Sequence, residues 1–340
     1  MSDLFSAQNA SRVDSRRVYE VYEKWPSLAR EGFGVKVERT GKGLRKAYVL
    51  GMGGSASGGD IIVGWMAKRP DLEMAVFKGQ LPVGDMSDAL AIACSASGQT
   101  EETIEMLHSA VERHATVVSI GGGGRLKDVS ESLGIPFITA PKVIAPRYML
   151  PFFVFSTLAV VNKGLGLGCE EEAEDAFSAM DAEETDLRLT SDAPRNGAKS
   201  IASSVLGKTP AIYAARITRG VGIRFKNVLN ENAKIHAHFD GIPDAFHNEI
   251  EAWEDPRTDF LPIFLRHPGE ADRDRARADK MFSILSGAGK VPLQVNGRGA
   301  TSLARLMSMV YRLDMTSYYV AIGLGRDPFP VRNIDTLKKL

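Results

Sequence analysis

The feature that most constrains the fold is an apolar run ending in a glycine-rich turn, with a second apolar run behind it. Residues 47–50, "AYVL", lead into "GMGGSASGGD" (51–60) and then "IIVGWM". The layout returns in "ALAIACSAS" (89–97), which precedes an amphipathic segment over 100–114, and in "ATVVSIGGGG" (115–124). Strands that alternate with helices in this way predict a parallel, doubly wound α/β sheet.

The second half of the chain repeats this layout beyond an acidic stretch at residues 170–186. That stretch is typical of a solvated helix or linker. We expect helices at 197–206, 219–234 and 302–323, and strands at 209–216, 259–266 and 290–296. The predicted parts are an N-terminal helical segment (1–45), a first α/β subdomain (46–165), an acidic linker or helix (166–195) and a second α/β subdomain with a C-terminal helix and tail (196–340).

Composition places the chain among soluble globular proteins. It has 340 residues, of which 44% are apolar and 25% charged, and Lys plus Arg equals Asp plus Glu at 42 each. A net charge of zero gives no indication of nucleic-acid or membrane binding. The N-terminus has no apolar stretch typical of a signal peptide, and Cys94 and Cys169 suggest no disulfide framework, so we expect a cytoplasmic protein. The apolar run at 149–161 is shorter than the roughly 20 residues of a membrane span and predicts a buried helix.

The first glycine turn also fits a dinucleotide-binding pattern. "GMGGSA" satisfies G-x-G-x-x-A after a strand. That pattern needs an acidic residue closing the second strand to hold a ribose hydroxyl. The candidate second strand at 74–79 ends in Lys78 and Gly79 instead. A nicotinamide-dependent oxidoreductase is therefore a disfavoured alternative.

Two further motif matches, a P-loop-like stretch and a pair of histidines, are not supported by the residues around them. "ASSVLGKT" (202–209) resembles a P-loop, but a helix is expected before it and a strand after it, which reverses the order that phosphate binding requires. His236 and His238 are two imidazoles without further ligands, so we expect a structural or solvent role. We therefore expect no metal site.

The small residues after the first two strands suit a phosphate group without a nucleotide. Gly53 and Gly54 allow the backbone to approach closely, and Ser55 adds a hydroxyl. Ser95, Ser97 and Thr100 follow the next strand. Both loops would lie at the carboxyl ends of strands, which is the ligand-binding edge of an open α/β sheet.

With "GMGGS", "SASGQTEET" and the later "NENAK…HNEI", the sequence resembles the SIS fold and, within it, the two-domain bifunctional phosphoglucose/phosphomannose isomerases. The resemblance runs from about residue 45 to the C-terminus. Its most specific stretches are "RFKNVLNENAKIHAHFDGIPDAFHNEI" and "DPFPVRNIDTLKKL". It implies an α/β chain with two SIS-type doubly wound subdomains, each with a parallel sheet flanked by helices.

The resemblance also implies the site residues. The substrate phosphate would be bound by Gly54, Ser55, Ser95, Ser97 and Thr100. Two residues depart from the family pattern: Ala96 replaces a larger residue, and Gln99 replaces Asn. Neither change removes a hydroxyl donor.

By the same resemblance, Glu231, His247, Lys338 and Arg147 would be catalytic, with Lys339 as an alternative to Lys338. The reaction would interconvert glucose 6-phosphate, and also mannose 6-phosphate, with fructose 6-phosphate through a cis-enediol. A positioned carboxylate suits proton transfer from a weak carbon acid, and a histidine with a lysine suits ring opening. No cofactor is implied. The family's histidine enters from the neighbouring subunit, which implies a homodimer with shared active sites. A non-catalytic sugar-phosphate-binding regulator is the alternative function.

Overall fold

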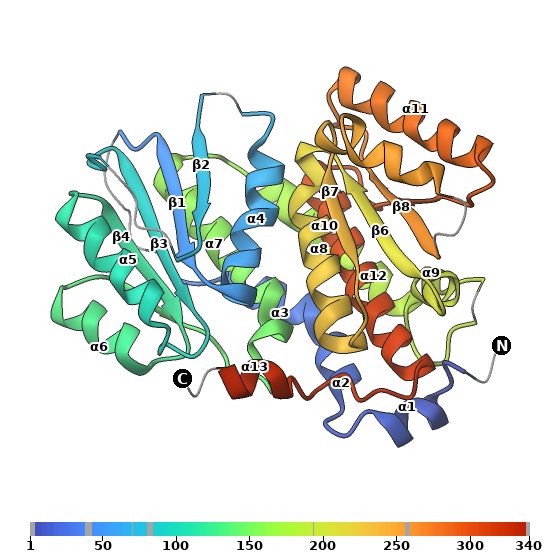
Figure 1. The fold of residues 1–340 in the computed structure, drawn as a ribbon. Coiled ribbons are helices and arrows are strands. Elements are labelled where there is room, and N and C mark those ends of the chain that lie inside the picture. The colour runs from blue at the N-terminus through green and yellow to red at the C-terminus, as the bar shows by residue number, and fades with distance from the viewer. Residues whose placement is uncertain are drawn as a thin grey trace. The chain divides into compact units, whose positions relative to one another are not determined.

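The structure, a computed structural model, describes residues 4–37, 43–69, 71–79, 84–192, 194–255 and 259–337. The chain forms two compact units, one of Met1–Glu23 with Ser178–Leu340 and one of Lys24–Phe177. Each unit contains one parallel sheet with helices against it (Figure 1). The N-terminal helices are divided between the units: α1 (Ala7–Val13) and α2 (Val18–Glu23) belong to the first, and α3 (Trp25–Phe33) to the second.

The sheet of the Lys24–Phe177 unit has five parallel strands in the order β2-β1-β3-β4-β5. Their bounds are β1 Lys46–Gly51, β2 Glu73–Phe77, β3 Ala89–Ser95, β4 Thr116–Gly121 and β5 Phe137–Thr139. The register pairs Gly51 with Cys94 and Ser95 with Gly121. Because all strands run the same way, the loops after β1, β3 and β4 begin at one edge of the sheet.

Helices cover both faces of this sheet. The helices are α4 (Gly53–Met66), α5 (Glu101–Glu112), α6 (Gly124–Ser132) and α7 (Leu150–Leu165). On one face, Leu50 and Ala91 join a core cluster with Leu107 of α5 and Leu126 of α6. On the other face, α4 packs its Gly59 against Val49, and Cys94 Sγ contacts Thr157 Oγ1 of α7 at 3.9 Å. Alternate residues of a strand point to opposite faces, so strands buried on both faces are apolar throughout.

Helix α7 is the core helix predicted from the apolar run. Every residue from Leu150 to Val161 is buried. With the short helix η1 (Pro146–Met149) before it, the segment Pro146–Leu165 is long and apolar enough to cross a membrane by length and composition. Its most apolar stretch is 72% buried inside the protein, which is the burial of a helix packed in a core.

The other unit has a four-stranded parallel sheet in the order β7-β6-β8-β9. Its strands are β6 Thr209–Ala214, β7 His238–Gly241, β8 Phe260–Arg266 and β9 Leu293–Asn296. The longer helices are α9 Gly197–Val205, α10 Arg219–Val228, α11 Asp272–Gly287 and α12 Ser302–Gly323. On one face Tyr213 and Phe264 pack with Met281 of α11, and on the other Gly222 of α10 faces Ala214 and Phe239.

The remaining helical segments are short or connect the parts of the chain. They are α8 Glu170–Asp186, α13 Arg332–Leu337, and the short helices η2 Arg216–Thr218, η3 Leu229–Ala233, η4 Asp244–Phe246 and η5 Glu249–Glu254. The acidic stretch at 170–186 is thus the helix α8. Segment η3 is a π-helical turn that directly continues α10. The predicted helix at 219–234 therefore changes type before it ends.

The predicted α/β class with two parallel sheets is confirmed. The apolar run at the start of 89–97 corresponds to β3, and the predicted strands at 209–216 and 259–266 correspond to β6 and β8. The predicted helix at 302–323 is α12. Neither β5 nor β7 was predicted; they are three and four residues long. A period of two cannot be recognised over so few positions.

Candidate functional site

The loops of small residues after β1 and β3, in the five-stranded sheet, touch each other. Ala96 N, in the loop after β3, donates a hydrogen bond to Ser55 Oγ, at the start of α4, at 3.0 Å. Ser55 is buried. Since its oxygen accepts from the backbone, its own hydroxyl hydrogen remains available to donate. The residues that the sequence assigned to one phosphate site are therefore neighbours in space.

The loop after β3 is ordered from within by Ser95. Gly98 N donates to Ser95 Oγ at 3.1 Å, and Ser95 Oγ and Thr100 Oγ1 lie 3.0 Å apart. Ser95 is 1% exposed, whereas Ser97 is exposed and accepts from Gln99 N at 3.2 Å. The two serines thus differ: Ser95 holds the loop together, and Ser97 faces outward.

Two helices begin at this pair of loops. Helix α4 begins at Gly53 and α5 at Glu101, and among the described residues neither first turn receives a side-chain cap. Thr100, at the N-cap of α5, engages Ser95 instead. The first N–H groups of a helix need partners and carry a partial positive charge. Uncapped starts beside hydroxyl groups are therefore suited to a phosphate.

Arg147 lies next to the start of α4. A Cβ added at Gly54 would come within 3.3 Å of Arg147 Cα, so the glycine permits this close approach. Arg147 is 6% exposed, and its guanidinium lies over the Tyr148 ring, 4.5 Å from the centroid. An arginine stays charged when buried. The unit thus brings together Gly54, Ser55, Ser95, Ser97, Thr100 and Arg147, as expected of neighbouring loops at one sheet edge.

In the other unit, Glu231 lies on the π-helical turn η3 and is partly buried. The asparagines on either side of it are anchored: Asn230 Nδ2 donates to Ile235 O at 2.8 Å, and Asn232 is fully buried. π-Helical turns occur often at functional sites. The anchoring gives the candidate base a fixed backbone. The family resemblance implied Glu231 as the base, whereas nothing in the sequence indicated the π turn.

His247 is the C-cap residue of the short helix η4 and is exposed. Two residues later, Glu249 is held inward, because Tyr213 Oη donates to Glu249 Oε1 at 2.6 Å and Trp253 Nε1 donates to Tyr213 Oη at 2.8 Å. Burial raises the pKa of the Glu249 carboxyl. The Lys338 and Lys339 positions lie outside the described residues.

The structure also shows where the P-loop-like stretch and the histidines His236 and His238 lie. The P-loop-like stretch runs from the end of α9 into β6, so its helix does precede its strand. His238 begins β7 and packs on the Phe260 ring at 5.0 Å between centroids, while His236 is exposed. Across the described residues, His, Cys, Asp and Glu form no group of three that could hold a metal ion.

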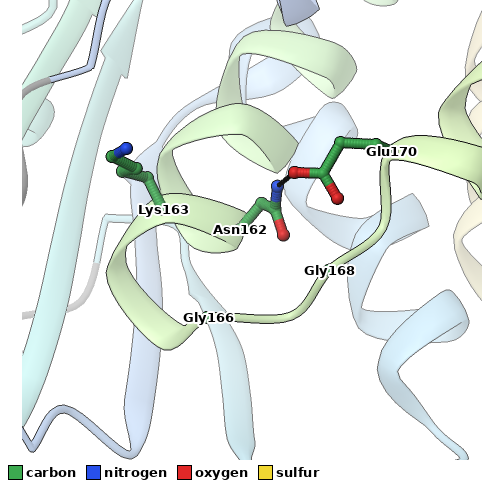
Figure 2. Close-up of a pocket in the computed structure, with 5 residues that line it drawn as sticks. All are labelled: Asn162, Lys163, Gly166, Gly168 and Glu170. Carbon is green, nitrogen blue, oxygen red and sulfur yellow. Dashed lines mark hydrogen bonds between the residues drawn. The ribbon is translucent and has the colours of Figure 1, made fainter.

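A separate hollow of about 350 Å³ lies at the C-terminal end of α7 (Figure 2). It is lined by Asn162, Lys163, Gly166, Gly168 and Glu170. Asn162 Nδ2 donates to Glu170 Oε1 at 2.8 Å, which lowers the pKa of that carboxyl. At 1.5 Å per helical residue, Asn162 is roughly 20 Å from Arg147, which lies in η1 directly before α7. The hollow is thus separate from the loops after β1 and β3 and from Arg147.

Comparison with known proteins identifies the family. The model of the bacterial phospho-glucose isomerase C-terminal SIS domain matches residues 195–340. The bifunctional phosphoglucose/phosphomannose isomerase of Aquifex aeolicus (strain VF5) is 30% identical over 85% of this chain and 88% of its own length. The chain belongs to the bifunctional phosphoglucose/phosphomannose isomerase family. The predicted family is confirmed.

A further relative and a solved structure are also similar to this chain. The D-glucosamine-6-phosphate 4-epimerase of Sulfolobus acidocaldarius is 28% identical over 72% of this chain and 76% of its own length. A crystal structure of a glucose-6-phosphate isomerase like protein from Thermus thermophilus has a TM-score of 0.67 at 18% identity, covering 100% of this chain and 99% of that one. At that identity the likeness shows a shared fold.

Proposed function

We propose that this chain is a sugar-phosphate isomerase that interconverts glucose 6-phosphate, and also mannose 6-phosphate, with fructose 6-phosphate. The observation that carries the proposal is the hydrogen bond from Ala96 N to Ser55 Oγ at 3.0 Å, which joins the two hydroxyl loops beside two helix N-termini. Membership of the bifunctional isomerase family supports it.

The phosphate would be bound by hydroxyl and backbone donors. Ser55 and Ser97 offer hydroxyl hydrogens, and the first N–H groups of α4 and α5 face the same edge of the sheet. A phosphate dianion is favoured there by several N–H groups and by the helix dipoles. Ser95 and Thr100 would support the loop that carries Ser97.

The chemical step is a proton transfer between C1 and C2 through a cis-enediol. Glu231 would act as the base, and its anchored backbone supports that role, because a general base must be held within hydrogen-bond reach of the proton that it removes. Arg147 would stabilise the negative charge that develops on the enediolate. His247 with Lys338 would open the sugar ring, by giving a proton to the ring oxygen and taking one from the C1 hydroxyl.

The same family resemblance implies the assembly, and the two free cysteines, Cys94 and Cys169, support the compartment. His247 is exposed on its own chain, as a side chain that serves a neighbouring subunit would be. We infer a homodimer with shared active sites in the cytoplasm. Size-exclusion chromatography with light scattering tests the dimer.

The deciding experiment follows the transferred hydrogen. The purified chain is incubated with fructose 6-phosphate in heavy water with a chelator present, and the products are followed by NMR. We expect glucose 6-phosphate and mannose 6-phosphate with deuterium at C2, because the proton on the base exchanges with solvent. Glu231→Gln should retain fructose 6-phosphate binding and lose turnover by at least the roughly 100-fold that a general base contributes.

The matched control is Glu112→Gln, a glutamate at the far end of α5, which should behave like the wild type. Binding of fructose 6-phosphate by the wild type without isomer formation would favour the regulator. A product changed at C4 would instead match the chemistry named for the Sulfolobus relative. Full turnover by Glu231→Gln would dismiss the assigned base.

A further inference from the structure

Arg224, about two helical turns before Glu231 in the sequence, forms a buried ion pair with Asp314 of α12. Arg224 of α10 is 2% exposed and Asp314 of α12 is 0% exposed. Two hydrogen bonds join them, Arg224 Nε to Asp314 Oδ2 at 3.1 Å and Arg224 Nη2 to Asp314 Oδ1 at 2.6 Å. Both charges interact electrostatically with Glu231. The proposed proton transfer uses neither residue. A buried pair is weak evidence for stability in itself, so a role in holding a conformation is worth testing.

A hydroxyl from the N-terminal helices links this pair to the turn that carries Glu231. Tyr22 of α2 is fully buried, and its Oη donates to Asp314 Oδ1 at 3.4 Å. The same Oη accepts from Asn232 Nδ2 at 3.1 Å. Asn232 Nδ2 also donates to Ser317 Oγ of α12 at 2.9 Å. The residue directly after Glu231 is thus tied by two hydrogen bonds to α2 and α12.

The π turn explains why Glu231 and Asn232, which are adjacent in the sequence, point in different directions. A π turn closes its hydrogen bond at i→i+5 rather than i→i+4 and therefore takes more residues per revolution than an α-helix. The extra residue turns Asn232 back toward the face on which Arg224 is buried and moves Glu231 off that face. The burial agrees, because Asn232 is 0% exposed and Glu231 is only partly buried.

The end of the turn is held as well. Lys234 has a left-handed φ of 55° and ends the helix. Arg326 Nη1 donates to Ala233 O at 3.0 Å and to Lys234 O at 2.9 Å. With the exit of the turn fixed in this way, Asn232, which is buried together with Leu229 and Ala233, holds the turn from the inside through its side-chain hydrogen bonds.

We propose that Tyr22 is a positioning residue for Glu231, acting through its hydrogen bond with Asn232 and through Asp314, so that α2 takes part in aligning the base. The inference rests on the proposed function. Tyr22 does not touch the sugar in this scheme. Its loss should therefore lower kcat and leave KM for fructose 6-phosphate unchanged, because the misplaced group acts in the proton transfer.

The test compares two tyrosine-to-phenylalanine variants of the full chain. Tyr22→Phe removes the linking hydroxyl, and Tyr319→Phe removes an equally buried hydroxyl that donates to Leu187 O, away from the η3 turn. We expect kcat for fructose 6-phosphate to fall about 3- to 10-fold in Tyr22→Phe, the range of one neutral hydrogen bond, and KM to stay within about twofold. Tyr319→Phe should keep both constants.

A double-mutant cycle separates positioning from a general loss of structure. In the Glu231→Gln background, Tyr22→Phe should not lower the residual rate further, because the group that it aligns is gone. Ser317→Ala, which removes the other acceptor of Asn232, should lower kcat in the same direction and decides between the outcomes if Tyr22→Phe fails to fold.

Three results would overturn the proposal. One is an unchanged kcat in folded Tyr22→Phe, and another is an equal fall of kcat in Tyr319→Phe. The third is an additive loss of rate in the Glu231→Gln background. These leave the proposed function intact when the wild type isomerises fructose 6-phosphate. A wild type without that activity would remove the proposed function and this inference together.

Discussion

Replacing Ser55 by alanine tests the phosphate loops most directly. Ser55 Oγ accepts from Ala96 N at 3.0 Å, so the variant loses this bond between the loops as well as a hydroxyl donor. A hydrogen bond to a charged group contributes about 1.5–3 kcal/mol, which corresponds to a rise in KM for fructose 6-phosphate of about 10- to 150-fold. The lost bond to Ala96 should lower the free energy of unfolding by about 1 kcal/mol.

The matched control is Ser57→Ala. Ser57 is also buried and lies two residues further along α4, but its Oγ donates to Gly53 O at 3.1 Å within the helix. Its removal should leave KM close to that of the wild type. Initial rates over a range of fructose 6-phosphate concentrations give both constants, and urea denaturation gives the stability.

A phosphate contact can be distinguished from loop damage by a second ligand. Inorganic phosphate should inhibit Ser55→Ala more weakly than the wild type, by the same factor as the rise in KM, because both ligands would use the same proposed donor. Equal KM values for Ser55→Ala and Ser57→Ala would refute the assignment. So would a rise in KM without a matching change in phosphate inhibition.

Two further predictions concern backbone packing and the thiols. Gly98→Ala should lower the free energy of unfolding by about 3 kcal/mol or more, because φ is +67° and the new Cβ would fall 1.6 Å from Gly123 O. Gly84→Ala, with φ +82° and no atom of the described residues within 4 Å of the new Cβ, should lose only about 1–2 kcal/mol, and equal losses on urea denaturation would contradict the steric argument. Burial raises the pKa of Cys94 and Cys169 to about 12, so both stay protonated at neutral pH. Iodoacetamide should label them, as judged by mass spectrometry, only after unfolding; rapid labelling of the folded chain would be inconsistent with their burial.

Part of the fold was determined by local sequence patterns. The alternation of apolar runs and amphipathic segments is a property of neighbouring residues, and it predicted β3, β6, β8 and α12 near their observed bounds. The apolar run at 149–161 predicted a buried helix because few residues in it can face water favourably, and α7 is buried from Leu150 to Val161. The glycine-serine turns predicted the candidate phosphate-binding residues for a similar reason, since small residues after strands favour close backbone approach.

The contacts that could organise a site were decided by tertiary structure alone. Ser55 and Ala96 are 41 residues apart, and they meet because β1 and β3 are neighbours in a parallel sheet. Tyr22 and Asn232 are 210 residues apart, and nothing near either position indicates the other. The expected N-terminal helical segment is likewise divided, with α1 and α2 in the unit of Ser178–Leu340. Propensity and periodicity act over a few residues, whereas a buried hydroxyl must find whichever partner packing brings to it. The π turn at Leu229–Ala233 follows the same rule, because it is packing that turns Asn232 inward.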